Sequence, residues 1–232
     1  MRLYPVEPSS KLAAKIAGIS KKKLRMDVLI KETDIRTLDT LVVIGNGTPD
    51  DIAVSIVAFH LNGDKIAGIV KPKTERRYGF ISVIPLYLKD KVRKVLVLMD
   101  QEDDQLNAIS ERIQTDWKEL TKSALEVIES DGEERVRIFK GKYGSKEFKL
   151  ILVINGLDAI HTDKHSIEDH LVSAAQQVSI AVGDFENSKA AWRLLSNDQQ
   201  LRIYKELKAH RRLAESVFPQ QVLGCRYLNE ES

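Results

Sequence analysis

The segment KVLVLMDQEDDQL, residues 94–106, is a run of apolar residues that leads directly into closely spaced acids. A short apolar run bounded by polar residues is typical of a strand buried in a sheet. The acids that follow it are Asp100, Glu102, Asp103 and Asp104. Two interpretations are open: a solvated turn before a helix, whose positive N-terminus favours acids, or a binding site for a divalent cation.

Two other apolar runs also end in polar residues. LDTLVVIGNG, residues 38–47, is followed by TPDDIAV, in which Pro49, Asp50 and Asp51 suit the first turn of a helix. The run KLILVIN ends at Asn155. In an open α/β sheet, ligands gather at the carboxyl ends of the strands. The three polar ends are therefore expected to share one edge of a sheet.

The remaining elements follow from periodicity and turn residues. Strands are predicted at 25–32, 64–72 and 77–86, with a glycine-containing hairpin across 135–156. Helices are predicted from Thr48 to Asn62, over 106–127, from His165 onward and from about Ser196 to Phe218. This alternation indicates an α/β fold, a three-layer sandwich around a mixed, largely parallel sheet.

The composition favours a globular chain that forms a single domain. The 232 residues are 43% hydrophobic and 30% charged, enough to bury a core. We divide this domain, residues 1–232, into an N-terminal extension (about 1–40), a core (about 41–172) and a C-terminal helical part (about 173–232). No apolar run approaches the length of about 20 residues that a membrane span needs.

Several classes of protein are disfavoured by the residues that the chain lacks. The N-terminal residues do not have the apolar segment of a secretory signal, and the single Cys225 excludes internal disulfides; both point to the cytoplasm. No Gly-x-Ser-x-Gly or Walker motif occurs, and the five histidines include no pair suited to zinc.

The acids could carry metal chemistry. Carboxylates crowded at one edge repel one another unless a cation joins them, and Mg²⁺ or Mn²⁺ prefers carboxylate oxygens. We expect Asp100, Glu102, Asp103 and Asp104 to bind the metal. The motif SIEDHL, residues 166–171, adds Glu168 and Asp169, so the catalytic candidates are Asp100, Glu168 and Asp169. An alternative is that Ser166 and Asp169 form a capping box that only starts a helix.

Basic residues and a glycine-rich turn could hold phosphate. The net charge is only +2, so local clusters matter more than the total. Alternatively, the turn merely links a strand to a helix and the basic side chains are solvated. The candidates for phosphate or DNA binding are Gly45, Asn46, Gly47, Lys71, Lys73, Arg76, Arg77, Arg202, Lys205, Lys208 and Arg212.

With these residues in view, the chain resembles Toprim-like metal-dependent nucleases over about residues 41–172. VVIGNGTPDDIAV (42–54) resembles the family's first strand and helix, and VLVLMDQEDD (95–104) resembles its later Asp-x-Asp segment. SIEDHL is similar to the acidic helix start of the OLD type. The family's first glutamate would align with Ile44, so either Asp50 or Asp51 replaces it or the likeness is one of topology only. An RNase H-like arrangement also collects carboxylates at strand ends.

The resemblance implies a nuclease that uses Mg²⁺ or Mn²⁺ to hydrolyse phosphodiesters. The character of the whole chain is also similar to an archaeal exonuclease that acts on single-stranded DNA and assembles as a homotrimeric ring. Our first hypothesis is a 3′→5′ exonuclease on single-stranded DNA. We therefore expect single-stranded nucleic acid, with DNA favoured, as the partner, no membrane, and a homo-oligomer such as a trimer. Two rival functions stay open: a non-catalytic nucleotide- or phosphate-binding module, and a structural subunit of a DNA-processing complex.

Overall fold

The computed structural model describes residues 1–7, 11–45, 48–61, 63–72, 78–130 and 135–230. Its centre is a seven-stranded sheet with the strand order β1-β3-β2-β4-β7-β6-β5. The first five strands in this order run parallel, and β6 is antiparallel to both of its neighbours, β7 and β5. This confirms a mixed, largely parallel sheet. The strands are β1 (Arg2–Pro5), β2 (Thr40–Val43), β3 (Ile66–Val70), β4 (Lys94–Asp100), β5 (Leu125–Ser130), β6 (Val136–Tyr143) and β7 (Lys146–Asn155).

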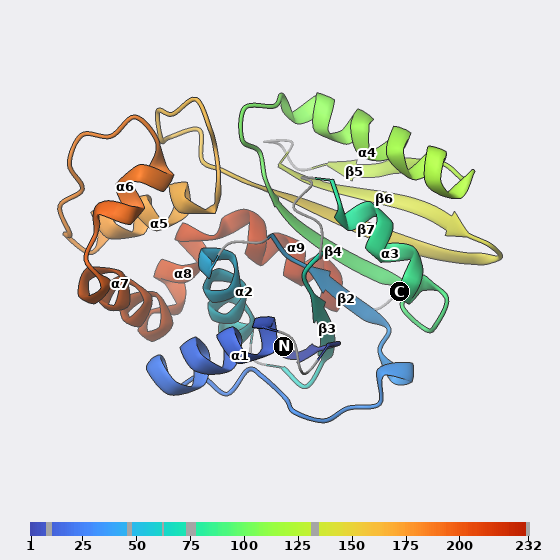
Figure 1. Ribbon diagram of the computed structural model, residues 1–232, viewed down its shortest axis with the longest axis horizontal. Helices are drawn as coiled ribbons and strands as arrows, with labels where there is room; N and C mark the ends of the chain where they lie inside the picture. Colours follow the sequence, from blue (N-terminus) through green and yellow to red (C-terminus); the bar gives the residue numbers. More distant parts are fainter. Residues whose placement is uncertain (8–10, 46–47, 62, 73–77, 131–134, 231–232) are drawn as a thin grey trace.

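Helices cover both faces of the sheet and complete a three-layer sandwich (Figure 1). One face carries α3 (Phe80–Leu88) and α4 (Leu106–Thr121). A π-helical turn, Ala17–Lys23, follows α1, and a 3₁₀ turn, Ile35–Thr37, precedes β2. The other face carries α1 (Lys11–Ile16), α2 (Thr48–His60), α5 (Ile167–Gln177), α6 (Ser188–Leu194), α7 (Asn197–Ala209), α8 (Arg211–Val217) and α9 (Pro219–Asn229).

The central strands are apolar throughout because both of their faces are buried. Along β4, Leu96 and Leu98 pack into the core beneath α2 and α9, while Val95 and Val97 pack into the core beneath α3 and α4. Successive side chains of a strand point to opposite faces, so a strand covered on both sides needs a continuous apolar run. This explains why the predictions of β2 and β4 are confirmed.

The connections after β2 and β4 leave in opposite directions. From β2 the chain passes through α2 to β3 on one side of β2. From β4 it passes through α4 to β5, at the opposite edge of the sheet. A point where neighbouring strands send their connections apart leaves a crevice at their carboxyl ends, and such crevices are the usual ligand sites of open α/β sheets. The topology therefore directs attention to the ends of β2 and β4.

Two predicted strands are absent as such. Residues 80–88 form α3, not a strand, because parallel β3 and β4 need a crossover element that covers the sheet. Phe80, Ile84 and Leu88, spaced four apart, form its buried face. Residues 25–32 make only an isolated bridge between Leu29 and β1. The N-terminal part nonetheless enters the sheet, since β1 pairs with β3.

The helix predicted over 106–127 ends earlier. It stops at Thr121, and Lys122 adopts a left-handed conformation with φ 62° that closes the last turn. The chain then returns as the edge strand β5. Leu120 and Val127, which lie within the predicted helix range, are each about half exposed at 52% and 47%. The stripe that packs on the sheet consists of Ile109, Ile113 and Trp117.

The predicted helix from about Ser196 to Phe218 is two helices. Ser196 is the N-cap of α7, but the chain bends at His210, whose φ of −117° and ψ of 98° are extended. Residues 211–217 continue as α8. The hairpin of β6 and β7 and the helices α2 and α5 are confirmed near their predicted positions.

Candidate functional site

Asp100 lies at the end of β4, where the connections of the sheet diverge, and we call the region around its carboxylate the crevice. Its register partner on β7 is Asn155, and Oδ1 of Asp100 accepts a hydrogen bond of 3.1 Å from Asn155 Nδ2. The same oxygen accepts a 2.9 Å hydrogen bond from the backbone N–H of Ile167, at the start of α5. Burial raises the pKa of Asp100, while Lys189 and these donors act against that rise. The polar ends of β4 and β7 therefore meet as predicted.

Two further carboxylates converge on Asp100. Asp50, in the first turn of α2, lies against the end of β2: a Cβ placed on Gly45 would be 3.0 Å from Asp50 Oδ1. Burial raises the pKa of Asp50 well above its usual range, and the charges of Asp100 and Glu168 raise it further. Burial and then Asp100 likewise raise the pKa of Glu168. Oε2 of Glu168 is buried and has no hydrogen-bond partner within the described part of the chain.

Two lysines enter the same region. Lys189, the second residue of α6, binds the Glu102 carboxylate, and its Nζ lies 3.6 Å from Asp100 Oδ2. Lys71, just after β3, lies 2.6 Å from Oδ1 of the buried Asp51. Asp51 is thus engaged with Lys71, whereas Asp50 faces the acids. Sequence reasoning missed Lys189, because nothing local links a lysine of α6 to a strand end almost ninety residues earlier.

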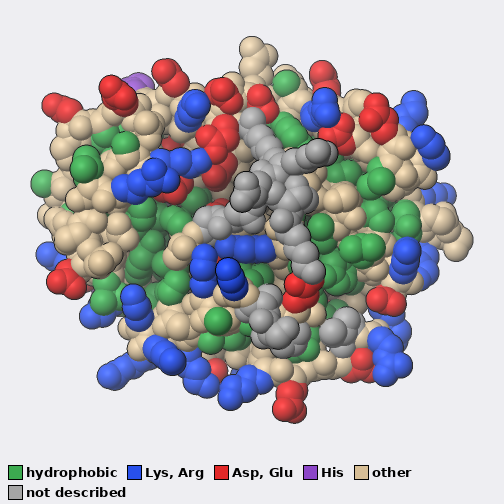
Figure 2. Space-filling view, in the orientation of Figure 1, with side chains coloured by type: hydrophobic (Ala, Val, Ile, Leu, Met, Phe, Trp, Pro, Cys, Tyr) green, Lys and Arg blue, Asp and Glu red, His purple; other side chains and the backbone are tan. Residues whose placement is uncertain are grey.

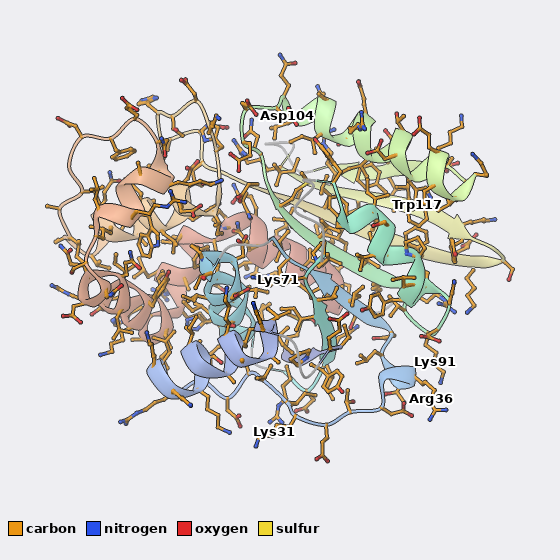
Figure 3. The ribbon with its side chains drawn as sticks, in the orientation of Figure 1. Lys31, Arg36, Lys71, Lys91, Asp104 and Trp117 are labelled. Atoms are coloured by element: carbon orange, nitrogen blue, oxygen red, sulfur yellow. The ribbon has the colours of Figure 1, made fainter. Side chains whose placement is uncertain are left out.

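The other acids after β4 differ in their surroundings. Asp103 is exposed, and Asp104 accepts a 2.9 Å hydrogen bond from the Tyr78 hydroxyl. In Figure 3, Asp104 lies at the start of α4, well away from Lys71 beside α2. Glu102 has φ 54° and exchanges two backbone hydrogen bonds with His165, which ties the loop after β4 to the loop before α5. Of the four expected metal ligands, Asp100 occupies the crevice and Glu102 lies beside it.

The capping-box interpretation of SIEDHL is wrong. Ser166 is the N-cap of α5, but its side chain makes no capping hydrogen bond. Asp169 is fully buried, and its Oδ2 accepts hydrogen bonds from the Leu157 N–H (3.1 Å) and from His165 Nδ1 (2.7 Å). Asp169 therefore holds the loop after β7, while the charge of its neighbour Glu168 acts on Asp50 and the charge of Asp100 acts on Glu168.

An arginine that the sequence did not single out lies beside the same loop. Arg135, just before β6, is 1% exposed, and its Nη1 donates to Gln101 Oε1 at 2.9 Å. Its other amino group pairs with Asp158. Tyr204 of α7 lies near Glu168 and Asp50: burial raises the pKa of its hydroxyl, and the charges of these two acids raise it further. Arg135 thus joins the loops after β4 and β7, and the Tyr204 ring lies near two acids of the crevice.

The predicted basic face of the last helix is divided. Arg202 and Lys205 are exposed on α7, while Lys208 lies with its Nζ 5.6 Å from the centre of the Phe59 ring. Arg212 belongs to α8, beyond the bend at His210, so the four do not share one face of one helix. Figure 2 shows acidic and basic side chains next to one another on the face in view. Of the phosphate candidates, Asn46, Gly47, Lys73, Arg76 and Arg77 lie outside the described residues.

The donor set suits a hard cation. Asp50, Asp100 and Glu168 offer carboxylate oxygens, the ligands that Mg²⁺ and Mn²⁺ prefer, and Glu168 Oε2 is buried without a hydrogen-bond partner among the described residues. In the described residues, however, no three His, Cys, Asp or Glu side chains already stand close enough together to enclose a metal ion. Binding would therefore require the side chains to close further, with Lys189 moving aside.

Comparisons with known proteins add no relative: no family model, no curated protein and no solved structure matches the chain. Across the described residues, no helix is long and apolar enough to cross a membrane. The chemistry of the crevice is therefore the basis for inferring a function.

Proposed function

We propose that the protein is a nuclease that hydrolyses phosphodiesters with Mg²⁺ or Mn²⁺, acting as a 3′→5′ exonuclease on single-stranded DNA. The observation that supports this most is the convergence of Asp50, Asp100 and Glu168 from three separate segments on the switch point of the sheet. Buried like charges are costly unless a cation compensates them. A site that keeps three such groups together has a use for that cation.

Each residue of the crevice has a role in this proposal. Asp100, Asp50 and Glu168 would hold the cation, which when bound supplies an activated water and stabilises charge on the phosphate. Asn155 and the Ile167 N–H orient Asp100. Lys189 offers an ammonium group beside the carboxylates, where a phosphate oxygen could replace its present partners.

Asp50 is our candidate for the role of the glutamate that Toprim-like nucleases have at the position of Ile44. Ile44, which stands in its place, is 1% exposed and packs in the core. Asp51 pairs with Lys71. Asp50 instead lies beside Gly45, and the charges of Asp100 and Glu168 raise its pKa. We therefore assign the role of that glutamate to Asp50.

A non-catalytic phosphate-binding module is the second candidate. The observation in its favour is that lysines already pair with the acids: Lys71 with Asp51, and Lys189 with Glu102 and Asp100. Such pairs neutralise the crevice without a metal. A cytoplasmic location, a homo-oligomeric state such as a trimer, and binding of DNA in preference to RNA complete the proposal for the nuclease.

The decisive experiment is incubation with end-labelled oligonucleotides. Single- and double-stranded DNA and RNA, labelled at either end, are incubated with Mg²⁺, Mn²⁺ or EDTA, and products are resolved by length. We expect metal-dependent shortening of single-stranded DNA from its 3′ end. Asp100→Asn preserves shape but removes the anion, so the rate should fall at least about 100-fold, the loss typical of removing one strong electrostatic contribution.

Asp103→Asn is the matched control, because Asp103 is an exposed acid three residues away. Its activity should stay within about twofold of the wild type, as for most surface substitutions. Full activity in Asp100→Asn would contradict the site. Wild-type protein that cleaves nothing but binds oligonucleotides equally in EDTA would instead favour the phosphate-binding module.

A further inference from the structure

Helix α9, near the C-terminal end of the chain, carries a buried amide, that of Gln221, which lies beside the crevice. Gln221 is 1% exposed, and its Nε2 donates a 2.8 Å hydrogen bond to Asn155 Oδ1. Asn155 Nδ2 in turn donates the 3.1 Å hydrogen bond to Asp100 Oδ1. Two amides therefore connect α9 to the carboxylate at the end of β4.

The far end of this chain of hydrogen bonds is fixed by His170. Its Nδ1 lies 2.6 Å from the Val217 carbonyl oxygen, which can only accept, so Nδ1 carries the proton. His170 Nε2 is consequently an acceptor, and the N–H of Gly156 donates to it at 3.2 Å. The Gln221 Nε2, also 3.2 Å away, is the second donor to that nitrogen.

The donors and acceptors then have only one consistent arrangement. Gln221 faces two acceptors, His170 Nε2 and Asn155 Oδ1, so it must present its NH₂ group to both. Because the oxygen of Asn155 accepts from Gln221, its NH₂ group must point toward Asp100. Rotating either amide by half a turn would place an oxygen against an oxygen or against the ring lone pair. The arrangement therefore directs an N–H of Asn155 at the carboxylate.

From this geometry we infer that Gln221 is a positioning residue for Asp100: it fixes the orientation of the Asn155 amide, which keeps an N–H donor directed at the Asp100 carboxylate and holds that carboxylate in position to bind the cation. The inference rests on the proposed metal-dependent function of the crevice. Hydrogen-bond partners behind a metal ligand commonly set metal affinity by about 10- to 100-fold, although they never touch the ion.

Two substitutions of similar volume separate this role from simple packing. Gln221→Met fills the space but removes the donor, which frees the Asn155 amide to rotate. Gln221→Glu keeps the shape but turns an acceptor toward Asn155 Oδ1, which favours the reversed amide and sets its oxygen against Asp100. A residue that only filled space would tolerate both changes alike.

Gln220→Met is the matched control. Gln220 is the preceding residue of α9, is 3% exposed, and donates to the Gly156 carbonyl at 3.3 Å instead of to Asn155. Removal of its amide should perturb the same helix to a similar extent without changing the donor that faces Asp100. Circular dichroism spectra verify that all three variants are folded.

The measurement is Mn²⁺ affinity, followed by the electron paramagnetic resonance of the free ion, together with the NMR signals of the Asn155 side-chain amide in metal-free protein. We expect Mn²⁺ binding to weaken about tenfold or more in Gln221→Met, at least as much in Gln221→Glu, and less than about twofold in Gln220→Met. In both Gln221 variants the Asn155 NH₂ signals should also shift and exchange faster.

Wild-type affinity in both Gln221 variants, with unchanged Asn155 signals, would overturn the inference alone. Equal weakening in Gln220→Met would also overturn it, because the effect would then come from general loosening of α9. A wild-type protein that binds no Mn²⁺ would overturn the proposed function and this inference with it.

Discussion

At the scale of single residues, the loop after β7 is the most constrained part of the site. Gly156 has φ 143°, a conformation that residues with a side chain rarely adopt. A Cβ there would lie 2.6 Å from the Cβ of His165 and 2.9 Å from Arg135 Nη1. The loop can therefore bring Asn155, Asp169 and Arg135 close together only because residue 156 has no side chain.

Gly156→Ala should lower the free energy of unfolding by about 3 kcal/mol, since backbone strain and a steric clash act together. Chemical denaturation gives this value. Gly144→Ala in the β6–β7 turn is the control: its φ is 61° and a Cβ there meets nothing within 4 Å, so only about 1 kcal/mol of backbone strain is expected. Equal costs at the two glycines would contradict the close packing at Gly156.

At the scale of elements, two helices begin in different ways although both N-caps are serine. Ser196 Oγ accepts from the Gln199 N–H at 3.3 Å, and Gln199 Oε1 accepts from the Ser196 N–H at 2.9 Å, a complete capping box at the start of α7. Ser166 at the start of α5 has no such bond, because the acids of that turn serve the crevice and the loop after β7.

Ser196→Ala should therefore cost about 1 kcal/mol of stability, the usual value for the loss of an N-cap. Ser166→Ala should cost less than about 0.5 kcal/mol, since the Ser166 side chain makes no capping hydrogen bond to α5. Thermal or chemical denaturation of the two variants compares them directly. A larger loss of stability in Ser166→Ala would indicate that the Ser166 hydroxyl caps α5 after all.

At the scale of the whole molecule, the two helical layers share one sheet. Along β7, Val153 packs into the core beneath α5 and α9, while Leu152 packs into the core beneath α3 and α4. Neither layer can separate without exposing a face of the same strands. The N-terminal strand β1 and the C-terminal helices belong to this body, which fits a single domain over the whole chain.

The two tryptophans report on the two layers separately. Trp117, labelled in Figure 3, lies on α4 and packs in the core on one face of the sheet, whereas Trp192 lies on α6 and packs in the core on the other face. In Trp117→Phe and in Trp192→Phe, the fluorescence of the remaining tryptophan should follow the same denaturant midpoint as the far-ultraviolet circular dichroism, because a cooperative domain gives coincident transitions. A fluorescence midpoint clearly apart from the circular dichroism midpoint in either variant would indicate that the layers unfold independently.

Much of the architecture could be predicted from the sequence, because local patterns report which faces of an element are buried. The continuous apolar runs of β2 and β4 require cover on both sides, and the glycine-containing turn before Lys146 specifies a hairpin. The prediction of secondary structure from hydrophobic pattern was wrong where an apolar run was short. Residues 80–88 suit a strand or a buried helix equally well, and only the need for a crossover between parallel strands decides for the helix.

The sequence by itself determined that acids and polar groups stand at the ends of β2, β4 and β7, because strand ends and helix starts have local chemical signatures. Only the tertiary structure decided which of these groups meet. Asp50 faces Asp100 while its neighbour Asp51 faces Lys71, and Lys189 and Gln221 reach the crevice from helices far along the chain. The physical reason is that sequence spacing fixes which face of an element a side chain occupies, whereas the packing of whole helices on a shared sheet fixes what that face touches.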